Sequence, residues 1–260
     1  MPAAFADDVA GYADAGCFAI EVWLTKLEQH LASASPADTK TLLAARGVTL
    51  AAASYQGGLL LSQGEQRKAH FEHFRRRLDL CQEFAIPTMV LAADFAQKID
   101  AVSLGRAVVS LKQAAQWAAG FGVRLALEFR GADTFCTSLD TALSLVEQCG
   151  ELNLGVCLDA FHFYKGPSKT EDFDRLTNAN LAHVQLCDVA GVPRELMADA
   201  DRVFPGEGDF RLEPLIRKLR QIGYDGYVSL ELMNPMVWQS NIAQVAELGL
   251  AALARQLEAP

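Results

Sequence analysis

The sequence is short of positive charge and has no long apolar run. Its 260 residues carry 23 lysines and arginines against 32 aspartates and glutamates, a net charge of -9. Proteins that bind nucleic acid usually need a basic face, so this balance argues against such a partner. No run of about 18 apolar residues is present, so we expect no membrane-spanning helix. The opening segment, MPAAFADDV, has neither the basic start nor the apolar core of a secretory signal.

The six cysteines show no spacing typical of a zinc finger, because no two of them are separated by two residues. Four lie in hydrophobic surroundings, as Cys157 does in GVCLDA. We therefore expect reduced core cysteines in a cytoplasmic protein. The six are Cys17, Cys81, Cys136, Cys149, Cys157 and Cys187.

The sequence does contain a regular alternation of apolar runs and helix-like segments. Strands are predicted at 19–24, 48–53, 88–93, 123–129, 154–159, 181–188 and 227–232. Helices are predicted at 3–15, 35–47, 65–85, 103–120, 137–149, 170–176, 212–222 and 239–257. No G-x-G-x-x-G follows a strand, so a doubly wound nucleotide-binding sheet has no support. The pattern predicts one α/β domain over residues 1–260, a TIM (β/α)8-type barrel.

The first strand of that barrel cannot be found. The first predicted element is a helix, and a closed eight-stranded barrel needs one more strand before residue 3. Either the barrel is incomplete or the missing strand lies upstream of Met1. Three long loops, at 54–64, 160–169 and 188–211, all follow strands. Loops in that position build the active face of a barrel.

Four acceptor residues interrupt apolar runs near their carboxyl ends: Glu128, Asp159, Gln185 and Glu231. Each alone is weak evidence, because a single polar strand end is commonly a cap or an ion-pair partner. Together they would face one mouth of the barrel. Three carboxylates and an amide are costly to bury without a partner, and a divalent cation is the simplest partner for them.

The runs LEFRG, CLDAFHFY, AHVQLCDV, FPGEGDF and VSLELMN resemble the xylose isomerase-like TIM-barrel superfamily. This group includes sugar phosphate isomerases and epimerases, hydroxypyruvate isomerases and 3-dehydroshikimate dehydratases. The resemblance implies that Glu128, Asp159, Gln185 and Glu231 bind one divalent metal. Many members have histidine where Gln185 stands, whereas the hydroxypyruvate isomerase-like and dehydroshikimate dehydratase-like branches have glutamine. The harder amide oxygen favours Mn²⁺ or Mg²⁺, with Co²⁺ or Zn²⁺ as alternatives.

The resemblance also implies catalytic roles. Glu128 and Glu231 would serve both as metal ligands and as the acid/base pair that removes and returns a proton beside the substrate carbonyl. The metal would stabilise the resulting enediolate. His162, three residues after Asp159, would contact substrate oxygens. His183 is expected to point to the other side of its strand and to be a packed residue.

Four further residues are candidates for binding the substrate. Arg194 and Arg202 lie in the loop after the Gln185 strand, where a guanidinium could bind a carboxylate, a phosphate or a hydroxyl. The alternative for each is an exposed arginine paired with a nearby aspartate. Tyr55 and Gln56 follow a strand and could line the pocket.

Two enzyme classes therefore compete. The first is an isomerase or epimerase that acts on a ketose, an inosose or a related keto acid. The second is a lyase that loses the same α-proton and then eliminates water. A DNA-repair endonuclease would need more histidine ligands than the five histidines here supply, and a non-catalytic sugar-binding protein is a further alternative. We expect a homodimer, because the final helix is apolar.

Overall fold

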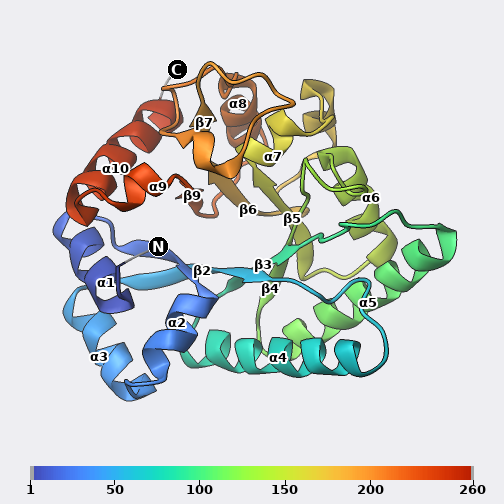
Figure 1. Ribbon diagram of the computed structural model, residues 1–260, viewed down its shortest axis with the longest axis horizontal. Helices are drawn as coiled ribbons and strands as arrows, with labels where there is room; N and C mark the ends of the chain where they lie inside the picture. The colour runs from blue at the N-terminus through green and yellow to red at the C-terminus, as the bar shows by residue number, and fades with distance from the viewer. Residues whose placement is uncertain (1–2, 259–260) are drawn as a thin grey trace.

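In the computed structural model, which describes residues 3–258, seven parallel strands curve into a nearly closed barrel with helices around the outside (Figure 1). In their order across the sheet, the strands are β1 (Ala19–Trp23), β2 (Thr49–Gln56), β3 (Thr88–Ala92), β4 (Arg124–Glu128), β5 (Leu154–Asp159), β6 (Leu181–Leu186) and β9 (Val228–Leu230). All seven predicted strands are confirmed, and so is the TIM-barrel class.

The helices alternate with these strands along the chain. They are α1 (Phe5–Asp14), α2 (Leu24–Leu31), α3 (Pro36–Ala45), α4 (Gly64–Glu83), α5 (Ala101–Gly120), α6 (Leu139–Cys149), α7 (Ala160–Lys165), α8 (Glu213–Gln221), α9 (Pro235–Trp238) and α10 (Ile242–Glu258). Ser35 begins α3 as predicted, since its hydroxyl accepts a hydrogen bond from the Asp38 backbone N–H at 3.1 Å.

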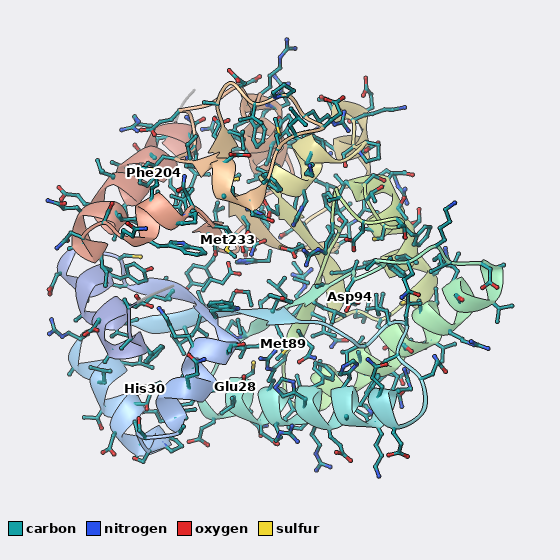
Figure 2. The ribbon with its side chains drawn as sticks, viewed as in Figure 1. Glu28, His30, Met89, Asp94, Phe204 and Met233 are labelled. Atoms are coloured by element: carbon teal, nitrogen blue, oxygen red, sulfur yellow. The ribbon has the colours of Figure 1, made fainter. Side chains whose placement is uncertain are left out.

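Each strand presents two different faces. Outward side chains such as Met89, which lies between the sheet and α4 (Figure 2), join the main hydrophobic core under the helices. The inward face carries a small apolar cluster of Val90, Ala126, Cys157 and Ala182. Because side chains alternate along a strand, Glu128 and Asp159 share the inward face with Ala126 and Cys157. The apolar cluster therefore lies deeper in the barrel than the acidic strand ends, since Ala126 and Cys157 precede Glu128 and Asp159 by two residues on the same strands.

The barrel has an open seam. Among residues 3–258, no strand pairing joins β1 to β9, the two ends of the sheet. All three residues of β9 are partly exposed, whereas β5 and β6 are buried throughout. The exposure of β9 follows from its unpaired edge, because a strand with only one neighbour is covered by fewer side chains. The open seam agrees with the prediction that the first strand of the barrel is missing.

One segment that was expected to be a loop contains helix, because residues 160–165 form α7 directly after Asp159. Asp159 Oδ1 accepts the Phe161 backbone N–H at 2.8 Å and caps this helix. Residues 24–31, for which no helix was predicted, form α2 directly after β1. The loop after β6 contains a two-stranded antiparallel ribbon of β7 (Asp188–Val189) and β8 (Arg202–Val203). The segment predicted as a short helix at 170–176 is a 3-10 helix, Thr170–Arg175.

Within the described part of the chain, no helix combines the length and apolar character needed to cross a membrane.

Candidate active site

The four predicted acceptors lie together at the carboxyl ends of the last strands. Glu128, Asp159 and Gln185 are the inward residues at the ends of β4, β5 and β6, and Glu231 follows β9 by one residue. Asp159 and Gln185 are fully buried and Glu128 is 7% exposed. Asp159 is in register with Gln185. Neighbouring parallel strands thus bring chain-distant polar groups to one place.

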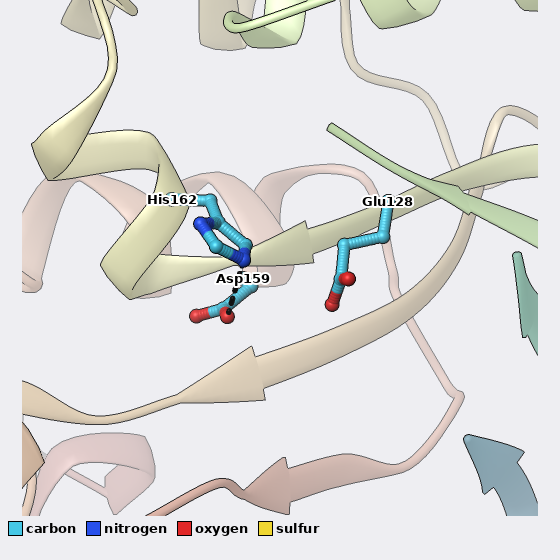
Figure 3. Close-up of side chains that lie close together, drawn as sticks. All are labelled: Glu128, Asp159 and His162. Atoms are coloured by element: carbon cyan, nitrogen blue, oxygen red, sulfur yellow. Dashed lines mark ion pairs between the residues drawn. The ribbon is translucent and has the colours of Figure 1, made fainter. Parts of the chain in front are cut away.

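His162 joins two of these carboxylates. One ligand atom from each of Glu128, Asp159 and His162 lies within 4.8 Å of the others (Figure 3). His162 is buried on α7, and its Nε2 is 3.9 Å from Asp159 Oδ2. Its predicted contact with substrate oxygens remains a prediction. The imidazole is also a candidate metal ligand in its own right.

Arg202 lies between two of the acidic groups. Its Nη2 is 2.8 Å from Asp159 Oδ2 and its Nη1 is 2.8 Å from Glu231 Oε2, and the residue is 1% exposed. The same guanidinium binds Asp199 Oδ1 at 2.8 Å and stacks over the Phe161 ring at 4.4 Å. Arg202 is therefore a buried partner of the acidic cluster and not the exposed arginine of the alternative, and its role in binding substrate remains a prediction.

The residues present fit a divalent cation. The ligand atoms of Glu128, Asp159 and His162 lie within 4.8 Å of one another, and all three residues are buried. Buried carboxylates this close together need positive charge beside them. Arg202 Nη2, 2.8 Å from Asp159 Oδ2, supplies one such charge, and a cation that accepts oxygen and nitrogen ligands would supply another. Glu128, Asp159, Gln185, Glu231 and His162 are the side chains available to hold it.

Glu21 is a site residue that sequence reasoning missed. It lies on β1, yet its Oε1 accepts the Gln185 Nε2–H at 2.8 Å and its Oε2 is 2.8 Å from His183 Nε2. The Gln185 Nε2 also lies 3.4 Å from Glu231 Oε1. With its nitrogen held by Glu21, the amide can offer only Oε1, which now accepts from the Cys157 thiol, to a cation. The available signal was a carboxylate at an inward position of the AIEVW run.

His183 is buried, as expected, but its side chain does not point to the other side of its strand. Residues two apart on a strand share a face, so His183 points into the barrel with Gln185. Its Nε2 contacts Glu21 on β1 and, at 3.0 Å, the Ser229 hydroxyl on β9. This side chain therefore links the two strands that border the open seam.

The carboxyls of the site fall into two classes, those with a raised pKa and those with a lowered pKa. Burial raises the pKa of Glu128 to about 8, and the Asp159 charge adds to the rise while Arg202 and Arg130 oppose it. Burial likewise raises the pKa of Glu231 well above its usual range, against the effect of Arg202. Burial acts to raise the pKa of Asp159, but the charge and hydrogen bond of Arg202 outweigh it, so that pKa is lowered.

Glu21 and His162 complete this pattern. Burial acts to raise the pKa of Glu21, but the charge and hydrogen bond of His183 outweigh it and lower that pKa. Burial lowers the pKa of His162, which keeps the imidazole neutral at pH 7. Without a bound cation, Glu128 thus holds a proton at neutral pH while Asp159 and Glu21 are ionised.

The raised pKa of Glu128 predicts that the metal-free protein loses stability as the pH rises. Protonated Glu128 makes its full contribution to the free energy of unfolding below the unfolded-state pKa of about 4.3. This contribution is lost as the pH rises through the folded-state pKa of about 8, because between these two values only the folded chain keeps the proton. We expect the melting temperature to fall by roughly 4 °C or more across this window, and by less in Glu128→Gln. Thermal melts in chelator from pH 5 to 8 measure this, and equal falls in both proteins would contradict it.

Within the part of the chain that the structure describes, the other predicted substrate-binding residues make no hydrogen bond or ion pair with the acidic cluster; they are Arg194, Tyr55 and Gln56. Arg194 is exposed, and its Nε donates to the Lys165 carbonyl at 2.9 Å. Tyr55 is 45% exposed at the end of β2. Gln56 is buried, donates to the Gly57 carbonyl at 2.7 Å and leaves its Oε1 without a partner among residues 3–258. Their substrate roles remain predictions.

Comparison with known proteins places this geometry in a family. The profile described as xylose isomerase-like TIM barrel matches residues 9–256. An inosose isomerase from Halalkalibacterium halodurans is 34% identical over 131 residues, which are 50% of this chain and 46% of that protein. A 3-dehydroshikimate dehydratase from Pseudomonas aeruginosa is 26% identical over 227 residues, 85% of this chain and 35% of that protein. The chain thus covers under two thirds of the length of the first curated relatives it matches.

The fold comparison agrees. A crystal structure of the IOLI protein with a bound zinc atom matches with a TM-score of 0.92 at 21% identity, over 98% of this chain and 94% of that one. At this identity the likeness establishes the fold. Because the family profile also covers nearly the whole sequence, this protein belongs to the xylose isomerase-like TIM barrel family.

Proposed function

We propose that this protein is a divalent-metal-dependent isomerase or epimerase that acts on a keto sugar, a sugar phosphate or a related polyol ketone by abstracting an α-proton. The observation that carries the proposal is the meeting of Glu128 and Glu231, both with raised pKa, beside the ionised Asp159 and the buried Arg202. The names of the relatives support an isomerase, since one is an inosose isomerase.

Glu128 and Glu231 are assigned as the proton-transferring pair. They come from β4 and from the end of β9, which are separated by β5 and β6 in the sheet, so they approach the site from different directions. The pKa of Glu128, raised to about 8, lets that carboxyl both hold and release a proton near neutral pH, and the pKa of Glu231 is raised in the same direction. Two such groups can therefore remove a proton at one position and return it at another.

The remaining residues orient the substrate and the carboxylates. The neutral His162 can exchange a hydrogen bond with a substrate oxygen through its unpartnered Nδ1. Arg202 holds Asp159 and Glu231 in a fixed relation. A cation bound by Glu128, Asp159, Gln185 and Glu231 supplies a Lewis acid for the negative charge that develops on the substrate oxygens. The oxygen-rich set favours Mn²⁺ or Mg²⁺.

A panel of substrates tests the proposed activity. Metal-free protein reloaded with Mn²⁺ or Mg²⁺ is incubated with ketoses, inososes, hydroxypyruvate and 3-dehydroshikimate, and products are separated by chromatography. We expect an isomer of at least one keto substrate and no product in chelator. Conversion that is equally fast in chelator would rule out the metal-dependent reaction.

The second candidate is a lyase that uses the same site. It is favoured by the match to a 3-dehydroshikimate dehydratase over 85% of this chain. The glutamine at position 185 agrees with it, because the dehydratase-like branch of the family resembled here uses glutamine at the corresponding position. In the same panel, a lyase would give a dehydrated product with new conjugated absorbance.

Gln185→His is expected to keep metal binding but to shift its preference toward Zn²⁺ or Co²⁺ by roughly tenfold or more. The reason is that imidazole nitrogen is a softer ligand than an amide oxygen. Competitive titration of Mn²⁺ against Zn²⁺ in wild type and variant measures the shift. Cys157→Ser, which keeps a hydrogen-bond donor beside Gln185 Oε1 by putting a hydroxyl in place of the thiol, is the matched control. An unchanged ratio of affinities would count against Gln185 as a ligand.

A further inference from the structure

Arg130 lies at the mouth of the barrel but has no role in the chemistry described above. It follows Glu128 by two residues, in the continuation of β4. The next residue, Gly131, packs against α7 so closely that a Cβ there would lie 2.7 Å from the His162 carbonyl oxygen and 2.6 Å from the Gly166 nitrogen. The backbone beside Arg130 is therefore fixed against the helix that carries His162.

The Arg130 side chain is loosely held. Its ion pair with Asp133 is 4.0 Å long, and the guanidinium makes no hydrogen bond with any residue in the described part of the chain. The side chain is 35% exposed, whereas that of Asp133 is 16% exposed. Asp133 Oδ2 is buried and also lacks a hydrogen-bond partner among residues 3–258. A structural partner of Asp133 would be expected to satisfy that oxygen.

Arg202 shows the opposite arrangement. It is buried, and its nitrogens are distributed among Asp159, Asp199 and Glu231. Its donors are thus already engaged by protein carboxylates. Arg130 instead keeps its planar set of five N–H donors available to solvent beside the site.

We propose that Arg130 binds an anionic group of the substrate, a carboxylate or a phosphate, and so selects charged keto substrates over neutral ones. This deepens the proposed function and rests on it for the identity of the site. A guanidinium matches both anions through two parallel hydrogen bonds. With Glu128 two residues away and His162 on the helix that Gly131 contacts, the anion would sit at the edge of the acidic cluster, with the rest of the substrate directed into it.

Calorimetry on the Mn²⁺-loaded protein tests this without turnover. Three ring probes of similar size are compared: shikimate, which carries a carboxylate; myo-inositol 1-phosphate; and neutral myo-inositol. Arg130→Gln is expected to weaken binding of the preferred anion by at least about tenfold and to leave myo-inositol within about twofold. The probe with the larger loss identifies carboxylate or phosphate as the recognised group.

Two further variants separate binding from folding and from net charge. Arg130→Lys keeps the charge without the bidentate geometry and should recover only part of the loss. Arg46→Gln removes an exposed arginine that pairs with Asp14 just before β2, at the other end of the barrel, and should leave all three affinities unchanged. Melting temperatures verify that each variant is folded.

The proposal is overturned if neither anion binds wild type more tightly than Arg130→Gln, or if the neutral probe weakens equally. Failure of the proposed function would look different. In that case keto substrates would not be converted by any variant, while the dependence of anion affinity on Arg130 could still be measured.

Discussion

Replacing Glu128 or Glu231 by glutamine is expected to lower turnover by at least about 100-fold in protein that is kept saturated with metal. Glutamine keeps the size of the side chain and an oxygen ligand but cannot take up or release the proton. Loss of a positioned acid or base typically costs a factor of 10² to 10⁴ in rate. Steady-state kinetics on each variant, with bound metal quantified in the same samples, measures the effect.

Solvent isotope incorporation then distinguishes the mechanism. In D₂O, an isomerase or epimerase that works through α-proton removal places deuterium on the product carbon, and a lyase releases water with new conjugated absorbance. Glu21→Gln is a useful comparison, because Glu21 contacts Gln185 and His183 and is given no proton-transfer role. It should change metal affinity more than the rate at saturating metal.

Two outcomes would refute the prediction for Glu128 and Glu231. If wild type gives product that retains the original α-proton, and α-deuterated substrate shows that no internal transfer has occurred, then proton abstraction is not the reaction. Turnover within a few-fold of wild type in both glutamine variants would refute the assignment of roles even if exchange occurs.

Asp159→Asn is expected to weaken divalent-metal binding by at least about 100-fold. Asp159 is fully buried with an ionised carboxylate, and it contributes one of three ligand atoms that lie within 4.8 Å of one another. Outer contacts to a metal site cost 10- to 100-fold when lost, so a direct charged ligand should cost at least the upper end of that range. Metal content after chelation and reloading, followed by titration with Mn²⁺, measures the loss.

The matched control is Asp199→Asn. Asp199 pairs with the same guanidinium, but its side chain is 48% exposed and it is not one of the proposed ligands. Asp159→Asn should also lower the melting temperature, because it leaves the buried Arg202 with one charged partner fewer. Titrations are therefore made well below the melting transition. Unchanged metal content in both Asp159→Asn and Glu231→Ala would end the case for this site.

Local sequence patterns were sufficient for most of the fold. Each strand is a short apolar run, and its inward residues follow from strict alternation, so Glu128 and Asp159 could be placed at the mouth. In the structure both are buried and lie close together. The same rule, applied correctly, would have placed His183 beside Gln185. The α7 helix was missed because six residues are too few for a periodic pattern, and a cap on Asp159 starts it.

The sequence by itself therefore determined the alternation of strands and helices, the family and the acidic strand ends. Only the tertiary structure decided which charges meet. Glu21 and His183 are 162 residues apart, and Arg202 reaches Asp159 from the ribbon that follows β6. The physical reason is that a barrel brings the first and last strands of the chain to one seam. Contacts across that seam depend on closure of the sheet, and no local periodicity encodes them.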